Sequence, residues 1–109
     1  MELIKKAIRQ IANEEYERAN KKFPLFNSDH EGLAVLEEEM VETGTDWKTA
    51  CEIFDYLKIS VFKNEVAASM TSAENLKDHA INACAECIQV IAMCDKFIES
   101  KAKRGSGEC

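Results

Sequence analysis

Residues 30–42 read HEGLAVLEEEMVE and contain five glutamates, four of which would crowd one arc of a helix. On a helix, Glu31, Glu38 and Glu42 would fall within roughly 40° of one another around the axis, with Glu39 about 60° beyond them. Like charges one turn apart destabilise a helix by roughly 0.2–0.5 kcal/mol per pair. Hard divalent cations take carboxylate oxygens as ligands, so this crowding predicts a Mg²⁺ site, with Mn²⁺ as the alternative ion.

Glu31 also has a structural interpretation. The segment from Ser28 to Glu31 has the S-x-x-E form of a capping box, in which the two side chains satisfy free backbone N–H groups at a helix start. We favour capping over metal binding for Glu31. The helix is expected to run to about Thr43, with Gly44 as its C-terminal stop.

Apolar residues at helical spacing predict two more helices in the first two thirds of the chain. The first covers residues 2–22, and Pro24 ends it because the residue before a proline avoids the helical backbone conformation. The other covers about residues 47–68, with Thr45 or Asp46 as its N-cap. Trp47, in its first turn, is expected in the core.

A last helix is expected from about residue 73 to 103, behind a second T-x-x-E box at residues 71–74. Glu86 sits on the edge of its apolar stripe, and Cys87 and Cys94 lie within the stripe, where free cysteine packs as a small hydrophobe. The fold class is therefore all-α, a helical bundle of about four helices. In such bundles carboxylates from facing helices often converge on a metal.

Length and composition exclude several classes of protein. The 109 residues predict one domain over residues 1–104 and a disordered tail at 105–109. The net charge of −6 argues against nucleic acid as a partner. No apolar run approaches the roughly 20 residues that span a membrane, so we expect no membrane contact. Five cysteines, an odd number, and no signal peptide predict a cytoplasmic protein with reduced thiols.

Two blocks together resemble a known family. Residues 38–42 form E-E-x-x-E and follow His30-Glu31-Gly32, while residues 86–93 read ECIQVIAM. Both are similar to segments of the MazG-like all-α nucleoside triphosphate pyrophosphohydrolases, and most of all to the short phage-type members, whose second block reads E-A-x-Q-V-A-A-M. The two blocks and the helices that contain them cover roughly residues 25–100.

The resemblance implies an α-helical bundle that forms a homodimer or homotetramer. It implies a Mg²⁺-dependent hydrolase that cleaves a nucleoside triphosphate between the α and β phosphates, releasing pyrophosphate and a monophosphate. By position, the metal ligands would be Glu38, Glu39, Glu42 and Glu86. Either Glu38 or Glu39 would activate the attacking water.

Gln89 departs from the pattern of the wider family, although the short phage-type members that the chain resembles most also have glutamine at this position. The family's second metal motif is E-x-x-D, which would place aspartate at position 89, and glutamine offers a carbonyl oxygen without charge. Gln89 is therefore a doubtful ligand. The chain either completes the metal shell with water or substrate phosphate, or is a non-catalytic relative that binds a nucleotide or a protein partner.

Overall fold

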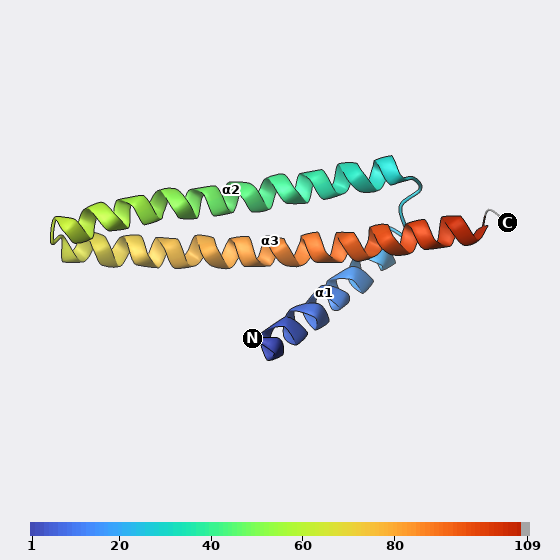
Figure 1. Cartoon of the computed structure of the whole chain (residues 1–109), viewed down its shortest axis with the longest axis horizontal. Coiled ribbons are helices and arrows are strands. Elements are labelled where there is room, and N and C mark those ends of the chain that lie inside the picture. Colours follow the sequence, from blue (N-terminus) through green and yellow to red (C-terminus); the bar gives the residue numbers. More distant parts are fainter. Residues whose placement is uncertain (108–109) are drawn as a thin grey trace. The chain divides into compact units, whose positions relative to one another are not determined.

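A computed structural model describes residues 1–107, with side chains described as far as residue 103, and this part of the chain contains helices and no strand. The helices are α1 (Glu2–Lys22), α2 (Asp29–Phe62) and α3 (Val66–Gly107), as Figure 1 shows. The all-α prediction is confirmed. None of these helices has a stretch long and apolar enough to cross a membrane. The expected tail at 105–109 overlaps the end of α3, and its residues 108–109 lie outside the described part.

The expected number of about four helices is wrong, because α2 continues through Gly44 for 34 residues. Glycine costs a helix about 1 kcal/mol relative to alanine, which is not enough to end a helix of this length. The Thr45 hydroxyl donates to the Val41 carbonyl at 2.9 Å, and the Thr49 hydroxyl donates to the Thr45 carbonyl at 3.1 Å. Thr45 is therefore bonded inside the helix and caps nothing.

The chain reverses instead between α2 and α3, at a turn built on Asn64. Asn64 has φ 56°, in the left-handed region that only glycine and asparagine adopt readily. Its N–H donates to the Val61 carbonyl at 3.0 Å, and the Glu65 N–H donates to the Ser60 carbonyl at 2.9 Å. These two bonds form a Schellman motif, which ends α2. The expected cap at residues 71–74 is wrong, since those residues lie inside α3.

The expected boundaries around Pro24 are confirmed. Phe23 follows α1 with extended backbone angles, φ −133° and ψ 108°, as a residue before proline should. The Glu31 N–H donates to the Ser28 hydroxyl oxygen at 3.1 Å, which is the capping bond predicted for the start of α2. The Glu31 carboxylate accepts a hydrogen bond from the Asn27 amide at 3.3 Å. Glu31 therefore forms hydrogen bonds at the N-terminus of α2, as the capping interpretation predicted.

The chain forms two compact units, and the expectation of one domain over residues 1–104 stays a prediction. The first, here the core unit, combines Met1–Met40 with the chain from Cys87 onward. The second, the hairpin unit, is Val41–Glu86 and consists of the end of α2 and the beginning of α3, which run antiparallel on either side of the Asn64 turn (Figure 1).

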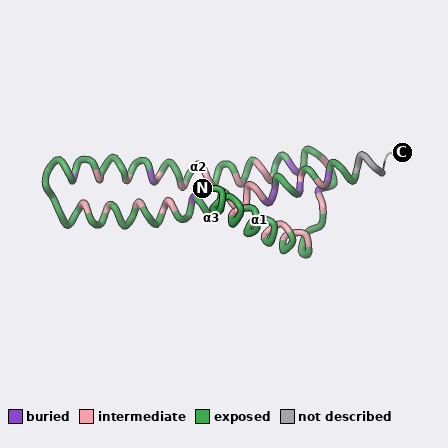
Figure 2. The backbone as a smooth tube through the Cα atoms, turned by 60° about the horizontal axis from the view of Figure 1, so that its bottom comes forward, coloured by how far each residue is buried: buried purple, intermediate pink, exposed green. Residues whose placement is uncertain are grey.

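The core unit has an apolar centre. Phe26, Ala92 and Met93 are buried there, and further side chains pack around them, namely Tyr16, Ala19, Val35, Leu36 and Phe97. Figure 2 shows buried positions of α3 within this unit. The Phe26 N–H donates to the buried Ser100 hydroxyl at 2.8 Å, and the Tyr16 hydroxyl donates to the Glu99 carboxylate. These bonds join α1 and the segment after it to α3.

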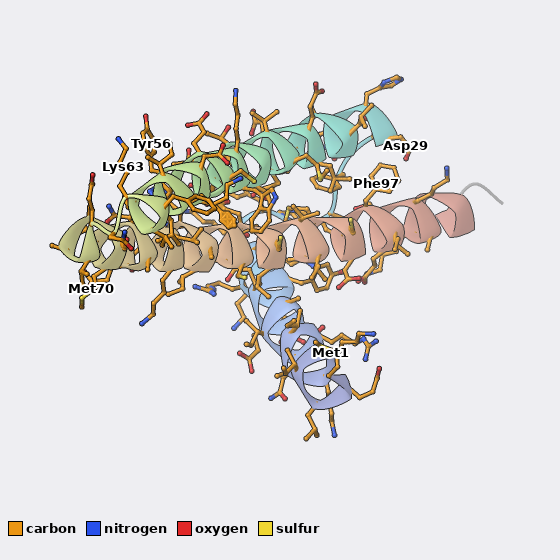
Figure 3. The ribbon with its side chains drawn as sticks, turned by 60° about the vertical axis from the view of Figure 1, so that its left-hand side comes forward. Met1, Asp29, Tyr56, Lys63, Met70 and Phe97 are labelled. Atoms are coloured by element: carbon orange, nitrogen blue, oxygen red, sulfur yellow. The ribbon has the colours of Figure 1, made fainter. Side chains whose placement is uncertain are left out.

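Close packing in the core unit depends on Gly32. A Cβ atom at Gly32 would lie 2.6 Å from Cδ2 of Phe97, closer than any real side-chain contact. Figure 3 shows Phe97 on the side of α3 that faces the start of α2, where Asp29 lies. The glycine therefore makes room for the Phe97 ring.

The hairpin unit has no comparable centre among its described residues. Its buried residues are small, namely Ala50, Ser60 and Ala83. Trp47 is 58% exposed and Phe54 is 43% exposed, so the expectation that Trp47 lies in the core is wrong. Tyr56 and Met70 point away from the hairpin in Figure 3. Two helices alone bring only one narrow stripe of each into contact, which leaves the larger side chains outside it.

The prediction that Cys87 and Cys94 pack in the core is also wrong, because both are exposed, as are Cys51 and Cys84. In the core unit, the face of α3 that is buried carries Ala92, Met93, Lys96 and Ser100. Cys94 follows Met93 directly and therefore points about 100° away from it around the helix.

Candidate metal centre

Two of the predicted metal ligands meet in the hairpin unit. Glu42 lies on α2 and Glu86 on α3, and the antiparallel course of the two helices places them opposite each other. One carboxylate oxygen of Glu42 and one of Glu86 lie within 4.8 Å of each other. The two residues are 44 positions apart by their numbers (86 − 42), so the fold creates this proximity.

Burial and acidic neighbours disturb the ionisation of Glu86. Partial burial raises the pKa of Glu86 above its ordinary 4.5, and the charge of Glu42, a hydrogen bond with Glu42 and the charge of Asp46 raise it further. A carboxylate close to other negative charges ionises less readily, so Glu86 holds its proton more tightly than an isolated glutamate does. A divalent cation at the same place would favour the ionised form of Glu86, because a metal ligand must be deprotonated.

Sequence reasoning missed Asp46. Together with Glu42 and Glu86 it forms what we call the acidic group. It lies one turn after Glu42 on α2, is partly buried, and contributes to the raised pKa of Glu86. We interpreted Asp46 as a possible N-cap because α2 was expected to end at Gly44. In a continuous helix, the spacing from Glu42 to Asp46 would have placed both carboxylates on one face.

The other predicted site residues belong to the core unit. Glu39 is partly buried one turn before Glu42 on α2, which is the spacing that makes helix residues neighbours. Glu38 is exposed on α2, and Gln89 is partly buried one turn after Glu86 on α3. The roles of Glu38, Glu39 and Gln89 as ligands, and of Glu38 or Glu39 in activating water, stay predictions.

An apolar cavity lies in the hairpin unit, and some of its lining residues follow Asp46 in the sequence. Its volume is about 420 Å³, within the usual range of ligand pockets. Its lining is mostly apolar and comprises Trp47, Ala50, Cys51, Phe54, Asp55 and Leu76. Trp47 follows Asp46 directly in the sequence, so the cavity and the acidic group draw residues from the same stretch of α2. A ligand with charged and flat apolar parts suits this arrangement.

No protein-family model matches the chain, and no curated protein or solved structure shows significant similarity to it. The likeness to the MazG-like pyrophosphohydrolases therefore rests on the two sequence blocks alone. The acidic group must be judged by its own chemistry. Three carboxylates, an unusual ionisation and a neighbouring apolar cavity are the features that a proposal has to explain.

Proposed function

We propose that the protein is a Mg²⁺-dependent nucleoside triphosphate pyrophosphohydrolase that releases pyrophosphate and a nucleoside monophosphate. The observation that carries the proposal is the Glu42–Glu86 pair, whose carboxylates approach each other and in which the pKa of Glu86 is raised. Crowded carboxylates oppose one another unless a cation joins them. Mg²⁺ favours carboxylate oxygens and commonly brings substrate phosphates as further ligands.

Glu42 and Glu86 would hold the metal, with Glu39 and Glu38 supplying further oxygens from α2. Mn²⁺ suits the same oxygen ligands. Bound there, the metal would neutralise the triphosphate and stabilise the charge that develops on its oxygens. Glu38 or Glu39, whichever does not ligate the metal, would orient and deprotonate the water that attacks the phosphate chain.

The cavity beside Trp47 supports a nucleotide over a simple phosphate. A base has a flat apolar face, and the cavity offers the exposed indole of Trp47 and the ring of Phe54. Stacking of a base on an aromatic side chain contributes roughly 1–3 kcal/mol. The cavity thus accounts for the organic part of the substrate, and the acidic group accounts for the phosphates.

The assembly we propose is a homodimer or homotetramer. The hairpin unit exposes large apolar side chains and buries only small ones, as expected of half of a helix bundle. A second copy of the hairpin would cover these side chains. Light scattering over a range of concentrations tests this, and a monomer at all concentrations would contradict it.

The test of the activity is incubation with each canonical ribo- and deoxyribonucleoside triphosphate, with pyrophosphate release measured. We expect release from at least one nucleotide, dependent on Mg²⁺. Glu42→Gln and Glu86→Gln should abolish it, because each removes a charge from the pair. Glu52→Gln is the matched control, an exposed glutamate of α2 within the same unit. The absence of release from every nucleotide would refute the proposal.

The alternative is a non-catalytic protein that binds a nucleotide or a protein partner. Gln89 favours it, because a partly buried neutral amide stands where the E-x-x-D motif of the wider MazG-like family has an aspartate. Calorimetry that shows nucleotide binding in Mg²⁺ without pyrophosphate release would support this alternative. Restoration of activity by Gln89→Asp would identify the missing charge as the cause.

A further inference from the structure

Lys96 is a buried charge in the core unit. It is 5% exposed and is the one charged residue among the described side chains that is buried. Its Nζ atom donates to the Phe23 carbonyl at 2.8 Å and lies 4.9 Å from the centroid of the Phe26 ring. Burying an ammonium group is unfavourable unless several partners compensate. Burial accordingly lowers the pKa of Lys96, which the charge of Glu31 opposes.

One role of Lys96 is structural. Its bond to the Phe23 carbonyl ties the segment after α1 to α3. An ammonium group has three N–H donors, however, and this bond uses one of them. The structural role explains neither the remaining donors nor the open space beside the side chain.

That space is a cavity of about 320 Å³, formed entirely within the core unit. Its walls are mainly apolar, with Phe23, Pro24, Phe26, Val35 and Met93 among them. Lys96 and Glu31 are the two charged side chains that line it. The volume lies at the small end of the range for ligand pockets, which suits a molecule of about the size of an amino acid.

We propose that this cavity binds a free α-amino acid with an aromatic or large aliphatic side chain. The carboxylate of the ligand would bind Lys96, its ammonium group would bind Glu31, and its side chain would lie against Phe23, Phe26 and Met93. The two charges of the lining decide the ligand class. A ligand with only a carboxylate is attracted by Lys96 and repelled by Glu31. A ligand with only an ammonium group is attracted by Glu31 and repelled by Lys96. A zwitterion is attracted by both.

The first experiment compares three ligands that differ in one charge each, by calorimetry and by amide chemical shifts of the full chain. They are L-phenylalanine, 3-phenylpropionate and 2-phenylethylamine. We expect phenylalanine to bind at least about tenfold more tightly than either analogue, because each lost group removes one charge-assisted hydrogen bond. The shifts should centre on the residues that line the cavity. Equal binding of 3-phenylpropionate and phenylalanine, or no saturable binding of any of the three, would overturn the proposal.

The second experiment assigns the two charges. Glu31→Gln should reduce the affinity for phenylalanine to that for 3-phenylpropionate, and Lys96→Met should abolish binding of both. Glu37→Gln and Lys77→Met are the matched controls, exposed residues of α2 and α3 that lie outside the cavity lining. Circular dichroism shows whether each variant folds. If Lys96→Met does not fold, the three-ligand comparison on the unaltered chain still decides the outcome. A loss of binding in the controls would count against the site.

Discussion

The two units of this protein differ in what they bury. The core unit encloses Phe26 and Met93, and hydrogen bonds to Ser100 and Glu99 join its helices. The hairpin unit buries only alanine and serine among its described residues, and leaves Trp47 and Phe54 exposed. Stability within one chain follows local burial, so the core unit should hold the fold and the hairpin unit should respond to ligands. The candidate metal pair lies in the hairpin unit, the unit that we expect to be less stable, so a bound cation should stabilise that unit most.

The largest difference between the units should come from truncating one large side chain in each. Met93→Ala should lower the free energy of unfolding by about 2–5 kcal/mol, because Met93 is 7% exposed and its removal leaves a cavity. Trp47→Ala should cost less than about 1 kcal/mol in dilute protein, since Trp47 is mostly exposed. Urea unfolding measures both. Equal losses would contradict the assignment of the core to one unit.

A pair of glycines provides the next comparison. Gly32→Ala should destabilise the protein by about 1–3 kcal/mol, because the new methyl group collides with the Phe97 ring. Gly44→Ala should stabilise it by up to about 1 kcal/mol, since Gly44 lies inside α2 with no atom within 4 Å of an added Cβ. Thermal melting of the two variants gives the signs. A destabilising Gly44→Ala would show that α2 breaks at this residue after all.

A smaller effect separates the two predicted helix caps. Ser28→Ala should lose about 0.5–2 kcal/mol, because the Ser28 hydroxyl oxygen accepts the Glu31 N–H. Thr71→Ala should be neutral or slightly stabilising, since Thr71 lies in the interior of α3. Urea midpoints of both variants test this. A clear loss for Thr71→Ala would place a helix start at residues 71–74.

The smallest effect should be a pH dependence of the hairpin unit without divalent metal. The folded pKa of Glu86 is raised above its ordinary 4.5, so the folded protein holds this proton more tightly than the unfolded chain. The stability due to this group is fully present below pH 4.5 and is lost as pH rises through the raised pKa. Glu86→Gln, compared with the unaltered chain by melting across pH, should remove this component. An unchanged profile in Glu86→Gln would contradict the raised pKa.

The sequence predicted those parts of the fold that depend on local chemistry. Pro24 and Ser28 act on their own backbone neighbourhood, so the end of α1 and the start of α2 were predicted correctly. Gly44 and Thr71 are signals that a long packed helix can override. Asn64 ends α2 with a left-handed conformation, which asparagine permits but does not require.

The candidate site was predicted in part for a related reason. Glu42 and Glu86 were identified from their blocks, and the structure brings them together. Asp46 was missed because its place on the same face depends on α2 being continuous. The burial of Lys96 could not be predicted either. It depends on how α1 and the segment after it cover α3, and a single lysine in a helical pattern normally indicates a solvated position.

The central claim is that the acidic pair of the hairpin unit binds a divalent cation. A Mg²⁺ titration followed by thermal melting tests it most directly, because an ion that binds only the folded state raises its stability by mass action. We predict a saturable rise in melting temperature for the unaltered chain and for Glu52→Gln, and none for Glu42→Gln or Glu86→Gln. A rise that is the same in all four proteins, or absent from the unaltered chain, would contradict the claim.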